Sequence, residues 1–440
     1  MTTLEKTQLA IHGGEKAVQS DPGDMFKWPI VTQEDEDAVL DVLRRGAMSG
    51  LDITLQFEQE FAAWQGTQYA LATNNGTSAL HCAMFGVGLG VGDEVICPSL
   101  TFWASVLQSL SLGASMVFAD IDPNTLCIDP ADIEHRISER TKAIIAVHYL
   151  GHPADMDPIL AIAQRHNLKV IEDVSHAQGG LYKGKKLGTM GDVGAMSLMS
   201  GKSFAIGEGG ILVTNDRTIY DRAIAFGHYE RYDNRIETDA LQPFKGLPLG
   251  GYKYRMHQMS SAVGRVQLKY YDQRITEIRQ AMNYFWDLLA DVPGLKPHRT
   301  PAGTSNMAGW YEPAGLYQPD ALGGLSATHF AEAVRAEGSL CRPGINKPLH
   351  THKLLTEADV YGHDRPTRIA FAQRDLIHEQ GQLPVSETIN ELTLHVPWFR
   401  HYRPSLIEEH ANAFRKVATN YAELLKDDPG NAPSLTQWPA

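Results

Sequence analysis

Three short segments of the sequence carry residue types that together suit amine chemistry on a bound cofactor. Asp173 ends the apolar run 168–173, Lys202 follows 29 residues later, and a tight turn that leads into a helical pattern begins at Asn75. Each segment alone has an ordinary structural explanation. Their combination is what indicates a chemical site.

Lys202 stands in a loop between two predicted strands, at 195–198 and 210–213. Removing an ammonium group from water is costly, and the same desolvation lowers the pKa of a lysine toward the neutral, nucleophilic form. The ordinary alternative is an exposed loop lysine. The segment 200–203 also resembles the end of a phosphate-binding P-loop, but that motif needs a glycine where Met196 stands and a helix where the pattern predicts a loop and a strand.

The other two segments suit the two ends of a phosphorylated ring. Asp173 follows an apolar strand, and open α/β sheets bind ligands at the carboxyl ends of their strands. The turn Asn75–Ser78 precedes a helix, whose first N–H groups are suited to bind a phosphate. Both segments are also compatible with ordinary helix N-caps, and for Asp173 taken alone the N-cap is the favoured interpretation.

Pyridoxal 5′-phosphate (PLP) needs all three kinds of group. Its aldehyde needs a lysine, its pyridine nitrogen needs a carboxylate that keeps it protonated, and its phosphate needs a cradle of N–H and hydroxyl groups. The sequence therefore supports the hypothesis of a PLP site at Lys202, Asp173 and the turn after Asn75.

The pattern around these residues predicts a parallel sheet with helices on both faces, because short apolar runs alternate with helical stretches from about residue 57 to 268. The predicted strands are 94–97, 115–119, 142–147, 170–171, 195–198 and 211–213. The predicted helices are 78–85, 158–166, 258–279 and 404–425, and the polar stretch 228–251 is predicted to be a long loop.

The length of 440 residues indicates two domains. We expect an N-terminal arm at 1–30, a large domain at 31–275 and a smaller α+β C-terminal domain at 276–440. The residues after about 427 are rich in Pro, Gly, Asn and Ser, so this tail is predicted to be flexible.

Composition restricts the partners and the location. Lys plus Arg total 39 and Asp plus Glu total 52, and a net charge of −13 disfavours nucleic-acid and anionic-membrane partners. No apolar run approaches the roughly 20 residues that span a bilayer. The segment Met1–Thr7 is polar and lacks the apolar core of a signal peptide, so we expect a cytoplasmic protein. The four cysteines are scattered, which predicts neither a disulfide framework nor a metal site.

Ordered matches along most of the chain resemble the DegT/DnrJ/StrS sugar aminotransferases, which have the fold type I architecture of aspartate aminotransferase. The matching segments are 57–66, 75–81, 92–96, 98–102, 113–114, 118–122, 140–145, 151–157, 172–173, 188–189, 191–192, 202, 207–210, 254–256, 348–350 and 383–384. The resemblance implies an α/β fold with a mainly parallel seven-stranded sheet in the large domain. It also implies PLP as the cofactor and a homodimer with active sites at the subunit interface.

The resemblance assigns roles around the cofactor ring. Lys202 matches the Schiff-base lysine, and Asp173 matches the carboxylate at the pyridine nitrogen. His176 matches a position that approaches the ring hydroxyl. Phe102 matches the aromatic residue that stacks on the ring, with Trp103 as a substitute.

It also assigns roles at the phosphate and on the substrate side. Gly76, Thr77 and Ser197 match phosphate contacts, which Ser78 joins through its backbone or hydroxyl, and His350 matches a substrate-side histidine.

Two features depart from the family pattern. The position where the family has an asparagine, which the partner subunit contributes to the phosphate, is Lys253, and a lysine there is expected to contact the phosphate as a point charge or to point elsewhere. The segment 228–249 is longer than usual and is expected to alter the mouth of the active site.

The resemblance implies transamination, because members of the family that dehydrate a sugar ring carry histidine in place of the lysine. The expected donor is L-glutamate or L-glutamine, and the acceptor is a nucleotide-linked keto-sugar or a keto-cyclitol. The segments Leu9–Gly14 and Trp28-Pro29 are similar to glutamine:scyllo-inosose aminotransferases, which favours a cyclitol. The alternative is a PLP-binding sensor or a dehydratase-like member without transamination.

Overall fold

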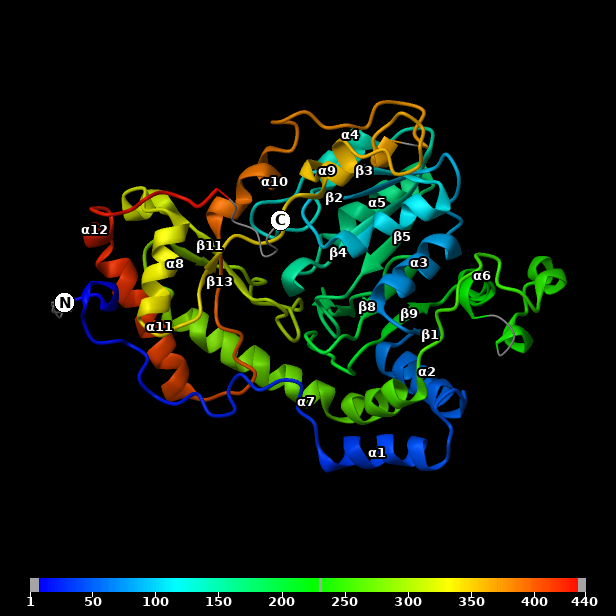
Figure 1. Cartoon of the computed structure of the whole chain (residues 1–440), viewed down its shortest axis with the longest axis horizontal. Helices are drawn as coiled ribbons and strands as arrows, with labels where there is room; N and C mark the ends of the chain where they lie inside the picture. Colours follow the sequence, from blue (N-terminus) through cyan, green and yellow to red (C-terminus); the bar gives the residue numbers. More distant parts are fainter. Residues whose placement is uncertain (1–7, 229–231, 370, 434–440) are drawn as a thin grey trace.

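The computed structural model describes residues 8–228, 232–369 and 371–433 (Figure 1). The α-helices are α1 (Gln33–Arg44), α2 (Asp52–Gln65), α3 (Gly76–Gly86), α4 (Pro130–Arg136), α5 (Met156–His166), α6 (Arg217–Gly227), α7 (Gln258–Leu288), α8 (Ala327–Ala336), α9 (Lys353–Thr356), α10 (Pro384–Thr388), α11 (Pro404–Thr419) and α12 (Tyr421–Leu424). The strands are β1 (Tyr69–Thr73), β2 (Glu94–Pro98), β3 (Ser115–Ala119), β4 (Thr141–Val147), β5 (Lys169–Asp173), β6 (Leu181–Tyr182), β7 (Lys185–Lys186), β8 (Val193–Ser197), β9 (Gly210–Thr214), β10 (Leu295–Pro297), β11 (Ala314–Tyr317), β12 (Arg342–Pro343) and β13 (Thr393–His395).

A seven-stranded sheet with the order β1-β9-β8-β5-β4-β2-β3 forms the centre of the larger part of the chain. Its pairings are parallel except where β9 pairs with β1 and β8. Its strands are almost wholly buried runs of apolar residues, as expected for a sheet covered by helices on both faces. The predicted fold class, an α/β protein with a mainly parallel sheet, is confirmed.

The sheet brings the predicted site residues to one edge. β5 ends at Asp173 and pairs in parallel with β8, which ends at Ser197. The segment after β2 carries Phe102, and α3 starts directly after β1 and packs against β8. Because the carboxyl ends of parallel strands meet at one edge, loops distant in sequence converge there.

A four-stranded antiparallel sheet with the order β10-β11-β13-β12 packs with α8 and α11 in a second part of the chain. The long helix α7 joins the two parts, since Tyr271 belongs to the core of the large sheet and Phe285 to the core of the small one. Ile345, Leu383 and Ile389 belong to the large core again, although they follow the small sheet's first strands. The limits 31–275 and 276–440 therefore stay a proposal, with the segment 345–389 returning to the larger part.

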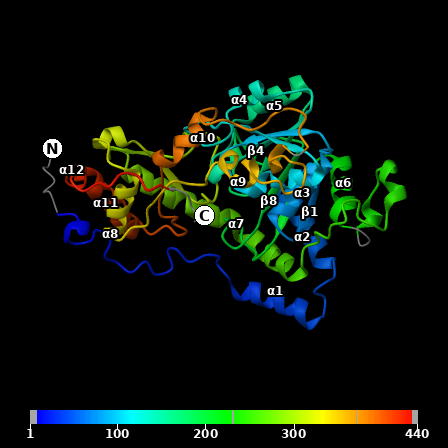
Figure 2. The same cartoon turned by 45° about the horizontal axis from the view of Figure 1, so that its top comes forward.

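The N-terminal arm runs beside the smaller part and crosses to α1 (Figure 2). The Val18 amide donates to the Glu337 carbonyl at 3.0 Å, and the Arg400 amide donates to Met25 at 3.2 Å. Nearer its end the Trp28 indole N–H donates to the carbonyl of Lys202 at 2.8 Å. The arm thereby connects the smaller part to the loop that carries Lys202.

Helix ends differ from the predicted ones for packing reasons. α7 extends beyond residue 279 to Leu288 because Met282 and Phe285 are buried in the small core. The predicted last helix breaks at Asn420 into α11 and α12.

The described residues of 228–251 form the predicted loop, whereas the start of the C-terminal tail is more ordered than expected. Within 228–251, 3-10 turns occupy Asp233–Arg235 and Asp239–Phe244, while 229–231 lie outside the described residues. Asp428 fixes the start of the tail, because its carboxylate accepts hydrogen bonds from the Ser326 amide at 2.7 Å and from the Ser326 hydroxyl at 2.6 Å. Residues 434–440 of that tail lie outside the described residues.

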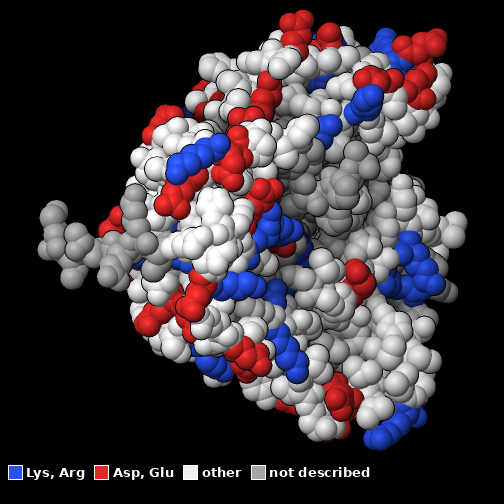
Figure 3. Space-filling model, turned by 60° about the vertical axis from the view of Figure 1, so that its left-hand side comes forward, with Lys and Arg blue, Asp and Glu red and all other residues white. Residues whose placement is uncertain are grey.

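Within the part of the chain that the structure describes, no helix is long and apolar enough to cross a membrane. On the face shown in Figure 3, basic side chains are interspersed with acidic ones.

Candidate active site

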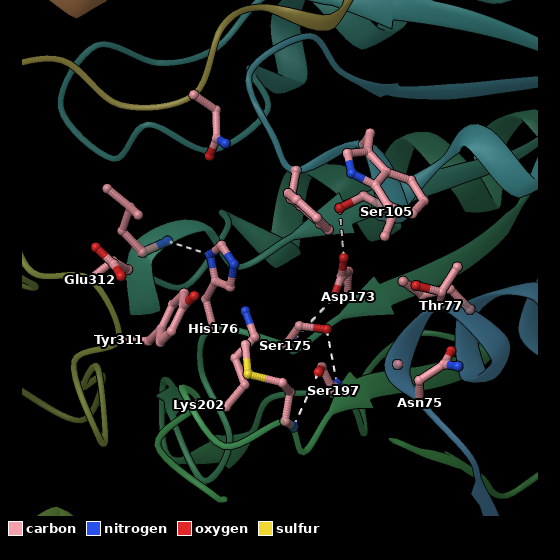
Figure 4. Close-up of a pocket in the computed structure, with 18 of the residues that line it drawn as sticks. Asn75, Thr77, Ser105, Asp173, Ser175, His176, Ser197, Lys202, Tyr311 and Glu312 are labelled. Carbon is pink, nitrogen blue, oxygen red and sulfur yellow. Dashed lines mark hydrogen bonds between the residues drawn. The ribbon is translucent and has the colours of Figure 1, made fainter. Parts of the chain in front are cut away.

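A cavity of about 460 Å³ lies at the carboxyl edge of the large sheet, where the smaller part closes one side (Figure 4). The residues that line it are Asn75, Gly76, Thr77, Leu80, Phe102, Trp103, Ala104, Ser105, Leu150, Asp173, Ser175, His176, Ser197, Met199, Lys202, Glu208, Tyr311, Glu312 and Asn346. The structure thus brings together the predicted Gly76, Thr77, Phe102, Asp173, His176, Ser197 and Lys202. Its size and mixed polar and apolar walls suit a small organic ligand.

One end of the cavity is the N-terminus of α3. Asn75 caps the helix, because its side-chain oxygen accepts from the Ser78 amide at 2.8 Å. A Cβ at Gly76 would lie 2.6 Å from the Cβ of Ser197, so only glycine lets the helix start approach the end of β8 this closely. The Thr77 and Ser197 hydroxyls therefore lie near a helix N-terminus, which favours an anion such as a phosphate.

Asp173 lies in the middle of the cavity and is held in place by hydroxyl and amide donors. Its Oδ2 accepts from the Ser105 hydroxyl at 2.7 Å, and its Oδ1 accepts from the Ser175 amide at 3.0 Å. Ser105 Oγ lies 2.8 Å from Thr101 Oγ1 in turn. The residue is 4% exposed, so the two donors offset part of the cost of burying its charge and fix its orientation.

We expect replacement of Ser105 by alanine to weaken cofactor binding about tenfold, because a hydrogen bond to a charged group contributes about 1.5–3 kcal/mol. Titration of the cofactor-free protein with PLP, followed by absorbance, measures the change. Ser109→Ala is the matched control, since the buried Ser109 hydroxyl has no hydrogen-bond partner among the described residues. Equal affinities for the two variants would contradict this role of Ser105.

Lys202 is buried, with 7% of the residue exposed, so the alternative of an exposed loop lysine is wrong. Burial lowers the pKa of Lys202 to about 8, while Asp173 and Glu312 act in the opposite direction. Its Nζ lies 3.8 Å from the centre of the Tyr311 ring. The P-loop reading is also wrong, because no helix follows Lys202 before β9. An amine with this pKa is partly neutral at a mildly basic pH and can act as a nucleophile or proton carrier.

His176 lies next to Lys202 and is buried. Burial, together with the nearby Lys202 charge, holds the pKa of His176 well below its usual value, so the imidazole is neutral. Its Nδ1 accepts from the Leu150 amide at 3.3 Å, which leaves the proton on Nε2. Phe102 and the half-exposed Trp103 form the aromatic wall, with ring centres 5.0 Å apart.

Three predicted residues do not line the cavity. Ser78 is buried and donates its amide to the cap at Asn75. Lys253 is exposed on the surface of this single chain. His350 is buried and its Nδ1 lies 2.6 Å from Ser99 Oγ, while its Nε2 lies 3.5 Å from Glu387.

Several lining residues were not predicted from the sequence. Ser105 lies three residues after Phe102, in the turn that Phe102 begins, so a position near the site could have been predicted from the sequence. Tyr311 and Glu312 come from the smaller part, and Asn346 comes from the segment 345–389, which returns to the larger part. None of the three stands in a motif, and only the folded chain brings them to Lys202.

The residues present suit PLP. A buried lysine of lowered pKa, a hydrogen-bonded carboxylate with free lone pairs and a glycine-dependent cradle at a helix N-terminus all face one cavity. Lys202 would hold the aldehyde carbon, Asp173 the ring nitrogen, and the start of α3 with Ser197 the phosphate.

The sequence and the fold are both similar to those of known proteins. The sequence profile of the DegT/DnrJ/EryC1/StrS aminotransferase family matches residues 29–396. An L-glutamine:2-deoxy-scyllo-inosose aminotransferase of Streptoalloteichus tenebrarius is 33% identical over 418 residues, 90% of this chain and 95% of that one. A GDP-perosamine synthase of Caulobacter vibrioides is 37% identical over 275 residues, 61% of this chain and 71% of that one. The crystal structure of an aminotransferase from Psychrobacter cryohalolentis superposes with a TM-score of 0.78 at 30% identity, over 90% of this chain and 99% of that one.

Proposed function

The chain belongs to the DegT/DnrJ/EryC1/StrS aminotransferase family and is a PLP-dependent aminotransferase that acts on keto-sugars or keto-cyclitols, and we propose that its acceptor is a keto-cyclitol and its donor L-glutamine or L-glutamate. The observation that carries transamination is the buried Lys202 beside Asp173 in one cavity. The cyclitol acceptor is supported by alignment length: the inosose aminotransferase of Streptoalloteichus tenebrarius aligns over 90% of this chain, and the perosamine synthase over 61%.

PLP, when bound, withdraws electrons from the carbon that bears the amino group and so acidifies its C–H bond. We propose that the neutral Nζ of Lys202 would take up that proton from the α-carbon of the donor and deliver it to the former aldehyde carbon of the cofactor, on the other side of the transferred nitrogen. Asp173 holds a proton at the facing ring nitrogen. The first amides of α3 and the hydroxyls of Thr77 and Ser197 bind the phosphate.

The aromatic wall and His176 orient the ring. Phe102 packs against its face, with Trp103 nearer the solvent, because Trp103 is 46% exposed. The proton on His176 Nε2 is available to the ring hydroxyl, since Nδ1 is occupied by the Leu150 amide.

We also propose that two copies form a homodimer that completes each site, with Lys253 contacting the phosphate of the partner copy. The exposure of Lys253 supports this role. Phe244, Leu247 and Leu249 in the preceding segment are 55%, 79% and 43% exposed, and that segment projects from the body next to α6 (Figure 1). Apolar side chains gathered on a projecting segment are typical of a subunit contact.

The acceptor can be identified by following the transferred nitrogen. The PLP-loaded protein is incubated with L-glutamine labelled with ¹⁵N at its α-amino group and with scyllo-inosose, 2-deoxy-scyllo-inosose or a nucleotide-linked 4-keto-6-deoxyhexose. We expect mass spectrometry to find the label on an inosose, and we expect added GDP or dTDP to leave the rate unchanged.

Two results would contradict the proposal in different ways. Label found only on the nucleotide-linked sugar, with inhibition by the free nucleotide, would keep the aminotransferase and change its acceptor. Failure of glutamine, glutamate and other common amino acids to lose their amino group would favour a sensor that binds PLP without turnover.

A further inference from the structure

One wall of the cavity is a short, strained segment of the smaller part of the chain. Ala308, Trp310 and Glu312 have φ angles of 48°, 51° and 49°, a region that residues with side chains rarely adopt. Strain of this kind persists only where the surroundings enforce it, and it concentrates at functional sites. Between the last two of these residues stands Tyr311, next to Lys202 and on its far side from Asp173 (Figure 4).

Packing holds the segment against the loop of Lys202. A Cβ at Gly309 would lie 2.3 Å from the Cβ of Ser203, the residue that follows Lys202. The Trp398 indole N–H donates to the Gly309 carbonyl at 2.9 Å, and Trp310 is 2% exposed. The position of the Tyr311 ring relative to Lys202 is therefore fixed from both sides.

The ring of Tyr311 faces the lysine amine. Nζ of Lys202 lies 3.8 Å from its centre, the His176 ring lies 4.6 Å away and Trp398 meets it edge-on at 5.8 Å. The negative face of an aromatic ring attracts an ammonium group, most strongly when both are removed from water.

We propose that Tyr311 is a positioning residue whose ring face holds the Lys202 amine in its protonated form, inside the cavity that Asp173 also lines, while the lysine is not bonded to the cofactor. This inference rests on the proposed role of Lys202 as the proton carrier. During that step the lysine is free and flexible, and a defined resting place shortens its search for the reacting carbon. The hydroxyl of Tyr311 has no part in this role.

The charges around the amine determine in which direction the pKa of Lys202 changes when the Tyr311 ring is removed. Lys202 is faced by Asp173 at the end of β5, by the neutral His176, by Tyr311 and by Glu312, and Glu208 lies elsewhere in the cavity wall. The ring face and both nearby carboxylates favour the ammonium form, whereas burial opposes it. Loss of the ring face alone therefore lowers the pKa of Lys202 further below about 8.

The test compares Tyr311→Phe, which keeps the ring, with Tyr311→Leu, which removes it. In cofactor-free protein, the pH dependence of Lys202 acylation, read by peptide mass spectrometry, gives the lysine pKa without any turnover. We expect the Phe variant to match the wild type. For the Leu variant we expect a lower pKa and a kcat about tenfold lower, with the KM for the donor nearly unchanged.

A second series covers the case in which the Leu variant folds poorly. Phenylalanines with increasing numbers of fluorine atoms at position 311 keep the shape of the ring while weakening its negative face, and we expect kcat and the Lys202 pKa to fall in step with fluorination. The proposal would be overturned if the Phe and Leu variants had the same kcat and the same Lys202 pKa. It would also be overturned if fluorination of the ring changed neither quantity. Because the acylation needs no substrate, such a failure is distinct from a wild type that transfers no amine.

Discussion

Alanine at position 202 is expected to abolish amine transfer while leaving the fold intact. In the proposed mechanism the lysine is the proton carrier at the reacting carbon, and positioned acid–base groups of this kind accelerate reactions about 10²–10⁴-fold. The variant also loses the amine that bonds to the cofactor. We therefore expect a loss of at least about 10³-fold in ¹⁵N transfer from labelled glutamine, with the thermal unfolding midpoint close to that of the wild type.

Small amines provide the decisive control. Alanine leaves a space where the lysine stood, so millimolar methylamine should restore part of the lost rate if the defect is the missing amine. Lys186→Ala is the matched variant, because Lys186 is also partly buried and its Nζ lies 3.9 Å from the Trp64 ring centre, but it does not line the cavity. A Lys202→Ala protein that still transfers nitrogen unaided, or an equal loss in Lys186→Ala, would remove Lys202 from the mechanism.

The central sheet was predictable because its strands are buried on both faces. Such strands appear in the sequence as short unbroken apolar runs, and β2, β3 and β9 lie within a residue of the predicted limits. The limits of α7 were harder to predict. Its second half is buried in the core of the smaller part and packs against α11, a helix that begins more than a hundred residues further along the chain.

The site was predictable where it depends on strand ends and helix starts. Asp173, Ser197 and Gly76 stand at the ends of regular elements, so the topology alone brings them to one edge. Tyr311 reaches the cavity only through the packing of the smaller part on the larger one, and Asn346 only through the return of the segment 345–389 to the larger part. The sequence around these residues contains no pattern that predicts this packing. The position of Tyr311 also depends on positive φ angles at Ala308, Trp310 and Glu312, and these residue types do not indicate such angles.

The same dependence on packing explains the position of His350. The sequence motif around His350 predicts a position near the site. In the structure its side chain forms a hydrogen bond with Ser99, the residue directly after β2. Its side chain is occupied by Ser99 and approaches Glu387, so it supports the segment that leads to Phe102 rather than the cavity wall. A role for His350 at the substrate stays a prediction, and in this chain it would require the side chain to leave both contacts.

Replacement of Asp173 by alanine is expected to reduce transfer about as severely as loss of the lysine. In the proposed mechanism the carboxylate faces a ring nitrogen that must stay protonated, and two unit charges about 4 Å apart interact with about 4 kcal/mol at an effective dielectric constant near 20. That energy corresponds to about 10³-fold in rate. The measurement is again ¹⁵N transfer, at PLP concentrations that saturate the variant, so that weaker cofactor binding does not enter the result.

A cofactor analogue separates the charge of Asp173 from its packing. N-methyl-PLP carries a permanent positive charge on the ring nitrogen, and the alanine variant has room for the methyl group where the carboxylate stood. If Asp173 acts by holding the nitrogen protonated, the analogue should restore much of the rate in Asp173→Ala and work poorly in the wild type, where the methyl group meets the carboxylate and its Ser105 partner. The exposed Asp157→Ala is the control for a lost surface carboxylate. Failure of the analogue in a variant that binds it and folds normally would mean that Asp173 acts through geometry rather than charge, and the network of Ser105 and Thr101 behind it would then be the feature that matters.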